Sequence, residues 1–409
     1  MYDYCQQNNW SGFDPFDGLN SRIFNALPLV QNRIGRLVFI QAMKRSPLNF
    51  RPIFLVPKEE NPKGLAVFCS ALLILSKTGF NPLPPGGGGL GWGGEGKHIS
   101  KSLPTASDDT IISLLNRLIA LKSKDMPYFC WGYNFDWQSR AFFLPKFVPN
   151  IICTTFAGNA LLDAYDKFKD SAHLDMAISA GNFLLEGLNV TRTDDESCFS
   201  YTPLDHGQVH NANLLGAAFL SRLYSLTQEK KFLEPAQSAV RYSLRRQNED
   251  GSWPYGEDKT QRWVDNFHTG YNLVALKRFF EYTGDTDVLE NIRKGFSFYI
   301  ANFFTEDGIP KYFHNQLYPI DIHAIAQSIM TLVEFKAYDK DNIDLAKRIF
   351  TWSLETMQSK EGYFFYQKKK YFINRIPYMR WSQAWMLLAL STLFEDYGHR
   401  AASELPDKG

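Results

Sequence analysis

Two aspartates occupy equivalent positions in a repeated segment of the chain. Asp265 and Asp321 each precede the last leucine of their segment by eleven residues. Paired carboxyl groups cleave glycosidic bonds, one as the acid and the other as base or nucleophile, with their separation deciding inversion or retention. Aspartate at this position also caps helices, since its carboxylate accepts the first N–H groups. The sequence leaves both roles open, and one residue can fill both.

Histidine, tyrosine and arginine near the same segments allow a second chemistry. His210, His268 and Tyr271 lie close to the starts of predicted helices and could transfer protons. Arg375 and Arg380 could hold a uronate carboxylate while a proton leaves C5, as epimerases and lyases require. The ordinary alternatives are histidines satisfied in the core, tyrosines packed on hairpins and arginines paired with loop carboxylates.

Loops before the same helices carry further polar and aromatic residues that we predict to bind substrate. Five of the eight histidines fall in these stretches, more than a solvated turn needs. Tryptophan offers a flat apolar face that suits a sugar ring, and functional side chains commonly lie in such loops. The predicted binding residues are Tyr133, Asp136, Trp137, Asp205, His206, Asn211, Trp253, His323, Arg375, Tyr378, Arg380, Trp381 and Gln383.

The elements that position these residues form a repeat. Nearly apolar segments rich in small residues align on their final leucines, at steps of 56 or 58 residues. Such composition predicts helices buried on both sides, whereas the amphipathic segments between them predict half-exposed outer helices. The aligned leucines are Leu162, Leu220, Leu276, Leu332 and Leu390, and the outer helices are predicted near 172–189, 230–248, 285–303 and 341–358.

Two less regular units precede this array. The apolar stretch from Lys63 predicts a first inner helix, and the stretch from Asp108 predicts an outer helix capped by Ser107. A segment near 18–45 could supply the remaining outer helix. Six helical pairs would close an all-α (α/α)6 toroid. The predicted organisation is an N-terminal extension with the first outer helix at 1–60, the toroid at 61–396 and a polar tail at 397–409.

The turns repeat as well. An acidic residue and a glycine, followed by alternating aromatics, come after the outer helices at Gln247, Phe304 and Gln358. This pattern predicts short β-hairpins, which would lie on one rim beside the starts of the inner helices. The glycine- and proline-rich stretch 80–106 breaks the pattern and is predicted to be a loop that could cover the cavity.

Composition narrows the classes of partner. A net charge of +1 gives no electrostatic basis for binding nucleic acid. The longest apolar run, 65–75, is too short to span a membrane. Five cysteines without a Cys-x-x-Cys pair predict neither a disulfide framework nor a zinc site. We therefore expect a cytoplasmic protein that needs no metal or cofactor, and the polar and aromatic loop residues lead us to expect an oligo- or polysaccharide as its ligand. The oligomeric state stays open.

The overall pattern resembles the six-hairpin (α/α)6 carbohydrate-active superfamily. Its members include unsaturated glucuronyl hydrolases, N-acylglucosamine-type sugar epimerases, glucuronyl C5-epimerases and polysaccharide lyases. The stretch from Arg380 resembles a late inner helix of such enzymes, which implies that Trp381 and Gln383 face the sugar. In the glucuronyl hydrolases two aspartates from neighbouring units are catalytic, a role that Asp265 and Asp321 would match. The chain also looks like proteins associated with bacterial surface-polysaccharide biosynthesis.

The resemblance favours an enzyme that cleaves a uronate-containing saccharide through Asp265 and Asp321. A uronate epimerase or lyase is the next alternative, and a non-catalytic glycan-binding toroid is another. The motif beginning at Gln247 resembles the QW repeat of terpene cyclases. The Asp-x-Asp-Asp of those cyclases is absent from the sequence, and many polar residues would surround a cavity that must be dry.

Overall fold

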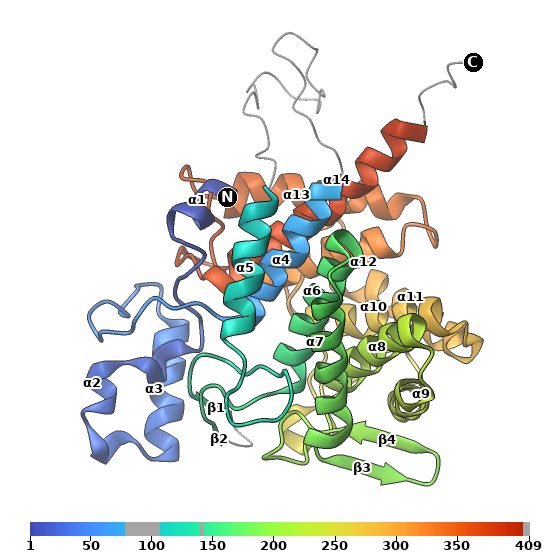
Figure 1. Cartoon of the computed structure of the whole chain (residues 1–409). Helices are drawn as coiled ribbons and strands as arrows, with labels where there is room; N and C mark the ends of the chain where they lie inside the picture. The colour runs from blue at the N-terminus through green and yellow to red at the C-terminus, as the bar shows by residue number, and fades with distance from the viewer. Residues whose placement is uncertain (78–106, 140–142, 404–409) are drawn as a thin grey trace.

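The computed structural model describes residues 1–77, 107–139 and 143–403 (Figure 1). Within these residues six inner helices pack side by side, and the last, α14, returns to pack on the first, α4. The ring therefore closes, which confirms the predicted all-α (α/α)6 toroid. The inner helices are α4 (Pro62–Lys77), α6 (Ile151–Phe168), α8 (His210–Thr227), α10 (Asn266–Thr283), α12 (Ile322–Glu334) and α14 (Trp385–Ser403).

Small residues allow the inner helices to approach one another. Gly158 on α6 faces Phe219 on α8, and a Cβ at this glycine would lie 2.3 Å from the phenyl ring. Cysteine and alanine fill similar places, and the five cysteines are buried with free thiols. Close approach makes the interior dense, so side chains rather than open space occupy most of the ring.

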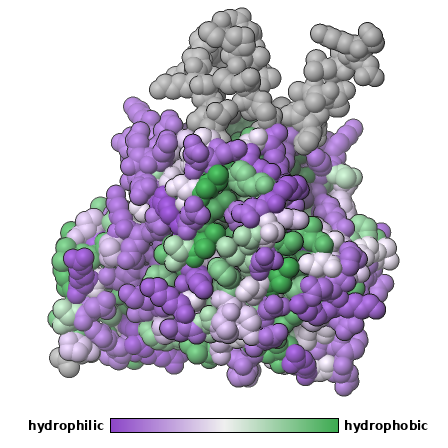
Figure 2. Space-filling view, viewed as in Figure 1, coloured by the Kyte–Doolittle hydropathy of each residue, from purple (hydrophilic) through white to green (hydrophobic). Residues whose placement is uncertain are grey.

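The outer helices each pack on the inner helix that precedes them. Their polar sides face outward, and Figure 2 shows a largely hydrophilic face with hydrophobic residues gathered toward its centre. Inner helices α6, α8 and α10 end in a residue with left-handed backbone, respectively Lys169, Gln228 and Gly284, which turns the chain into the next outer helix. The outer helices are α5 (Asp108–Ala120), α7 (Ser171–Asn182), α9 (Lys230–Leu244), α11 (Leu289–Phe303) and α13 (Asp341–Met357).

Short antiparallel strands lie beside the N-terminal ends of the inner helices, but not at the predicted turns, where Phe304 and Gln358 form isolated bridges with Pro310 and Phe364. The pairs β1–β2 and β3–β4 are hairpins, and β5, which leads directly into α12, pairs with β6 of a third hairpin, β6–β7. Positive φ angles at Gly251, Gly308 and Gly362 fit the predicted turns. The strands are β1 (Trp137–Gln138), β2 (Phe143–Leu144), β3 (Val190–Thr193), β4 (Glu196–Phe199), β5 (Ile320–Asp321), β6 (Gln367–Lys368) and β7 (Ile373–Asn374).

The first 60 residues contain short helices that lie beside the toroid in Figure 1. The longest is α3 (Arg33–Arg45), in the segment expected to supply an outer helix, and its main contacts are with the short helices η1 and η2 and with β1. Trp10 packs edge-on against Phe68 of α4, with 4.8 Å between ring centroids. The other helices are α1 (Tyr2–Gln7), η1 (Asp17–Asn20), α2 (Arg22–Asn25) and η2 (Pro28–Val30).

The glycine-rich stretch 80–106 lies outside the described residues, and α14 runs on to Ser403. Across the described part of the chain, no helix combines the length and the apolar character that crossing a membrane requires. Nor do three or more histidine, cysteine or acidic side chains there gather in a way that could hold a metal ion.

Candidate active site

Asp265 caps α10 and orients the histidine one turn later. One carboxylate oxygen accepts the backbone N–H of His268 at 3.0 Å. The other lies 2.8 Å from His268 Nδ1 and accepts the indole N–H of Trp263 at 2.9 Å. The carboxylate engages Nδ1, so Nε2 is the ring nitrogen that a ligand can contact. The His268 side chain is 20% exposed and packs on the ring of Tyr255, 4.5 Å between centroids.

Asp321 caps α12 and is completely buried. Its Oδ1 accepts the His323 backbone N–H at 2.8 Å and the Trp381 indole N–H at 2.9 Å. Its Oδ2 accepts the Gln367 amide at 2.5 Å. Burial raises the pKa of this carboxyl group, although the bonds from Gln367 and Trp381 oppose the rise. Both aspartates are therefore helix caps, and Asp321 uses both oxygens within the protein.

Tyr271 of α10 and His323 of α12 meet at the centre of the ring. The tyrosine hydroxyl lies 2.6 Å from His323 Nε2. Burial raises the pKa of Tyr271 well above its usual value, and burial together with nearby Lys63 lowers the pKa of His323 well below its usual value. At neutral pH the phenol therefore keeps its proton and the imidazole is neutral, so a hydrogen bond between two uncharged groups joins the two helices.

Lys63 of α4 lies beside this pair. It is only 5% exposed, and its ammonium sits over the rings of Phe156, Tyr271 and Trp385 at 4.7, 5.7 and 5.1 Å from their centroids. Burial lowers the pKa of its amine to about 7. We call Lys63, Phe156, Tyr271, His323 and Trp385 the central cluster.

Replacing Lys63 by Met should raise the free energy of unfolding at pH 7 by about 2 kcal/mol, since burying a charge is costly even where aromatic faces offset part of the cost. The unfolded amine binds its proton more tightly than the folded one, so wild-type stability is lost as the pH falls from about 10 to about 7. The advantage of Lys63→Met should therefore be large at pH 7 and small at pH 10 in urea unfolding. An equal difference at both pH values would contradict this.

Aromatic side chains surround the N-terminal ends of the inner helices, a region we call the mouth. Phe16 of the N-terminal segment lies between Trp137 and Trp381, at 6.1 and 5.6 Å between centroids. The hydroxyls of Tyr133 and Tyr201 are 3.0 Å apart. Trp381 and Trp137, both predicted to bind sugar, thus lie at the mouth with Phe16 packed against them.

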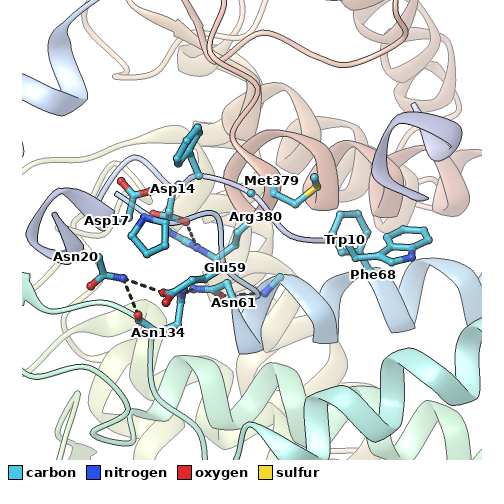
Figure 3. A pocket seen from close by; sticks show the side chains of 14 residues that line it. Trp10, Asp14, Asp17, Asn20, Glu59, Asn61, Phe68, Asn134, Met379 and Arg380 are labelled. Carbon is cyan, nitrogen blue, oxygen red and sulfur yellow. Dashed lines mark hydrogen bonds and ion pairs between the residues drawn. The ribbon is translucent and has the colours of Figure 1, made fainter. Parts of the chain in front are cut away.

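The N-terminal segment is fixed to the toroid by a buried ion pair. Arg380 lies in η6 (Met379–Ala384), a π-helical turn before α14, and donates to both oxygens of Asp14 at 2.6 and 2.8 Å (Figure 3). The arginine predicted to hold a substrate carboxylate therefore already holds one from the protein. A small pocket beside this pair is lined by Glu59, Asn61 and Asn134 among others, whose side chains bond one another.

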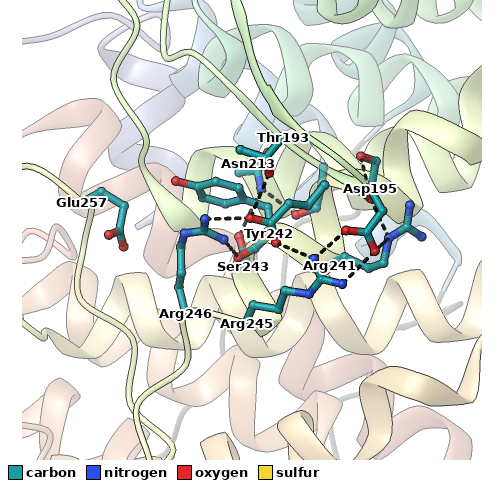
Figure 4. A network of polar contacts seen from close by, with 12 residues as sticks. Thr193, Asp195, Asn213, Arg241, Tyr242, Ser243, Arg245, Arg246 and Glu257 are labelled. Atoms are coloured by element: carbon teal, nitrogen blue, oxygen red, sulfur yellow. Dashed lines mark hydrogen bonds and ion pairs between the residues drawn. The ribbon is translucent and has the colours of Figure 1, made fainter.

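Several predicted site residues point away from the mouth. His210 is fully buried and turned outward, with Nε2 at 2.9 Å from Glu257 and Nδ1 at 3.3 Å from Ser243 of α9. Trp253 packs against Gly295 of α11, so it offers no face for stacking. Figure 4 shows the polar network of this region, where hairpin β3–β4 meets α9.

Other predicted residues form hydrogen bonds within the protein. The Gln383 side chain bonds the backbone N–H and C=O of Phe364, and the Tyr378 hydroxyl accepts a hydrogen bond from buried Arg51. Asp205 and Asp136 accept backbone N–H groups in their own loops. Three predicted binding residues remain. His206 and Arg375 are exposed, and Arg375 lies over the ring of Phe365. The buried amide oxygen of Asn211 has no partner among the described residues.

Sequence reasoning did not single out Lys63, Phe16 or Tyr201. A lysine in the first turn of an apolar helix was a usable signal, because a cation there opposes the helix dipole. Phe16 carried no signal, since its place at the mouth depends on the path of the N-terminal segment.

Comparison with known proteins identifies the fold. No family model and no curated protein matches the sequence. Among solved structures, cellobiose 2-epimerase of Bacillus thermoamylovorans aligns with a TM-score of 0.60 and 10% identity over 83% of this chain and 88% of its own. A sugar epimerase from a ruminal bacterium aligns with a TM-score of 0.57 and 14% identity, over 81% of this chain and 87% of its own. The GH76 α-mannanase of Bacteroides thetaiotaomicron aligns with a TM-score of 0.56 and 12% identity, over 82% of this chain and 86% of its own.

These alignments cover most of each chain at low identity, and they confirm the fold that the resemblance implied. The protein is a six-hairpin (α/α)6 toroid. The same fold serves epimerases and hydrolases, so the chemistry must be argued from the side chains at the mouth.

Proposed function

We propose that the protein is a saccharide-modifying enzyme of the epimerase type, which moves a proton at a carbon next to a carbonyl or carboxyl group. The observation that carries this proposal is the pairing of Asp265 with His268 Nδ1 at 2.8 Å. A carboxylate on one ring nitrogen fixes the tautomer and makes the other nitrogen a base. His268 lies at the mouth, one-fifth exposed, where a sugar can reach it.

The second group needed for epimerisation lies on the same helix, α10, and contacts a residue of the neighbouring helix α12. A proton removed from one face of a carbon must be supplied from the other face to invert it. Tyr271 is one helical turn from His268, and its hydroxyl lies 2.6 Å from His323. We assign proton abstraction to His268 and proton return to Tyr271, with His323 positioning the phenol. Trp137 and Trp381 would stack on the sugar once Phe16 gives way.

Glycosidic cleavage is the second candidate. Burial raises the pKa of Asp321, and a general acid needs a raised pKa. We rank it second because both Asp321 oxygens are bonded to Gln367, Trp381 and a backbone N–H. The uronate-containing substrate, its place in a bacterial surface polysaccharide and the cytoplasmic location are predictions from the sequence.

Solvent exchange tests the proposal. The protein would be incubated in D₂O with aldoses, N-acylhexosamines and uronate-containing oligosaccharides, and followed by proton NMR. We expect one sugar to lose a single C–H signal as the signals of its epimer appear. New reducing ends without deuterium at carbon would instead establish cleavage. Binding of a sugar with neither change would make the protein a glycan-binding toroid.

A further inference from the structure

Lys63 places an amine on the axis of the toroid. The side chain begins on α4, yet its nitrogen lies 5.7 Å from the ring centroid of Tyr271 on α10, three helices away around the ring. Phe156 of α6 and Trp385 of α14, on the two helices adjacent to α4, contribute the other two rings. An amine that approaches four of the six inner helices must lie near their common axis.

The contacts of this amine with the described residues are the three aromatic faces, and no hydrogen bond or ion pair joins it to any of them. The carboxylate of Asp14 acts on Lys63 electrostatically, but both of its oxygens already accept hydrogen bonds from the Arg380 guanidinium. Aromatic faces stabilise an ammonium but accept no conventional hydrogen bond. A buried cation without an acceptor is costly and is typical of functional sites rather than of structural cores.

Two further polar atoms in the central cluster lack partners. The indole nitrogen of Trp385 and Nδ1 of His323 are both buried without a partner among the described residues. Their rings stack at 4.6 Å between centroids. The cluster therefore holds two donors without acceptors, the Lys63 amine and the Trp385 indole N–H, beside an unpartnered imidazole nitrogen.

We propose that the central cluster binds a negatively charged oxygen of the ligand, with Lys63 as its main donor. Two sources of that oxygen fit: the carboxylate of a sugar acid, or the oxyanion that develops on a carbonyl oxygen when His268 removes the neighbouring proton. A preorganised cation facing such an oxyanion stabilises the transition state without reorganisation. The second source rests on the proposed function, whereas the first requires only that the protein binds a saccharide.

Ligand binding distinguishes the two sources. D-Glucuronate and D-glucose would be titrated calorimetrically into wild type, Lys63→Met and Lys63→Gln. For a carboxylate we expect wild type to prefer glucuronate at least tenfold, and both variants to lose that preference. For an oxyanion we expect unchanged affinities but a kcat at least 100-fold lower on the sugar found by solvent exchange, with KM nearly unchanged.

Lys294→Met is the matched control, because it removes the same charge from the exposed side of outer helix α11. It should change neither affinity nor kcat. Lys63 variants that keep both the glucuronate preference and the wild-type kcat would overturn the inference. Two substitutions are used so that the test still stands if one variant misfolds. A different result would refute the proposed function. That result is the absence of deuterium incorporation into any sugar, even if Lys63 is needed for carboxylate binding.

Discussion

His268→Gln should reduce turnover about 1,000-fold, within the range typical for loss of a general base. Glutamine preserves the backbone N–H that Asp265 caps and most of the side-chain volume, but it cannot take up a proton. The free energy of unfolding should therefore change by less than about 1 kcal/mol. Initial rates of deuterium incorporation, together with urea unfolding of the same sample, measure both quantities.

The chain offers a matched control for this variant. Asp170 and His173 repeat the spacing of Asp265 and His268 at the start of outer helix α7, with 3.9 Å between carboxylate and Nδ1. His173→Gln should leave turnover unchanged. Asp265→Asn should lower turnover as well, because an amide caps the helix but holds imidazole poorly in the required tautomer. Full activity in His268→Gln would exclude the proposed base and return Asp265 and Asp321 to first place.

Asp14→Ala should lower the free energy of unfolding by about 3–5 kcal/mol, the usual cost of leaving one partner of a buried ion pair uncompensated. The side chains of Arg380 and Asp14 are 4% and 7% exposed, so water cannot replace the lost carboxylate. The pair joins residues 366 positions apart and holds the N-terminal segment on the toroid. Equilibrium urea unfolding of wild type and variant gives the difference.

The large loss of stability expected for Asp14→Ala is attributed to burial of the ion pair. An ion pair that is exposed to solvent tests this explanation. Arg245 also donates to both oxygens of one carboxylate, that of Asp195, at 2.6 and 2.7 Å, but the two side chains are 54% and 52% exposed (Figure 4). Asp195→Ala should cost less than about 1 kcal/mol. The double variant Asp14→Leu with Arg380→Met should regain much of the loss, because it removes both charges. Similar losses in Asp14→Ala and Asp195→Ala would refute the explanation.

The helical repeat could be predicted directly from the sequence, because each unit contains its own apolar periodicity and capping residue. The apolar segments ending at Leu276 and Leu332 are long, periodic and bounded by aspartates that cap the helices. Helix type, hairpin turns and the six-unit ring follow from local patterns summed over the chain. The rim position of Asp265 and Asp321 follows as well, since equivalent positions in a repeat must lie at the same end.

The direction of each side chain could not be read in this way. His210 and His268 both stand near the start of an inner helix, yet one turns outward to Glu257 and the other pairs with Asp265 at the mouth. A rotation of part of a helical turn decides between them, and it depends on packing against residues far along the chain. The N-terminal segment is similar: nothing near Asp14 or Phe16 indicates Arg380 or Trp381 as neighbours.

The sequence by itself determined the toroid, its hairpin-bearing rim and the two capping aspartates, because periodicity and capping are properties of neighbouring residues. Tertiary structure alone decided that Tyr271 meets His323, that Arg380 is neutralised by Asp14, and that Lys63 reaches the axis without an acceptor. These contacts join helices separated by tens to hundreds of residues. Their distances depend on ring closure, which brings six helix ends together around one point.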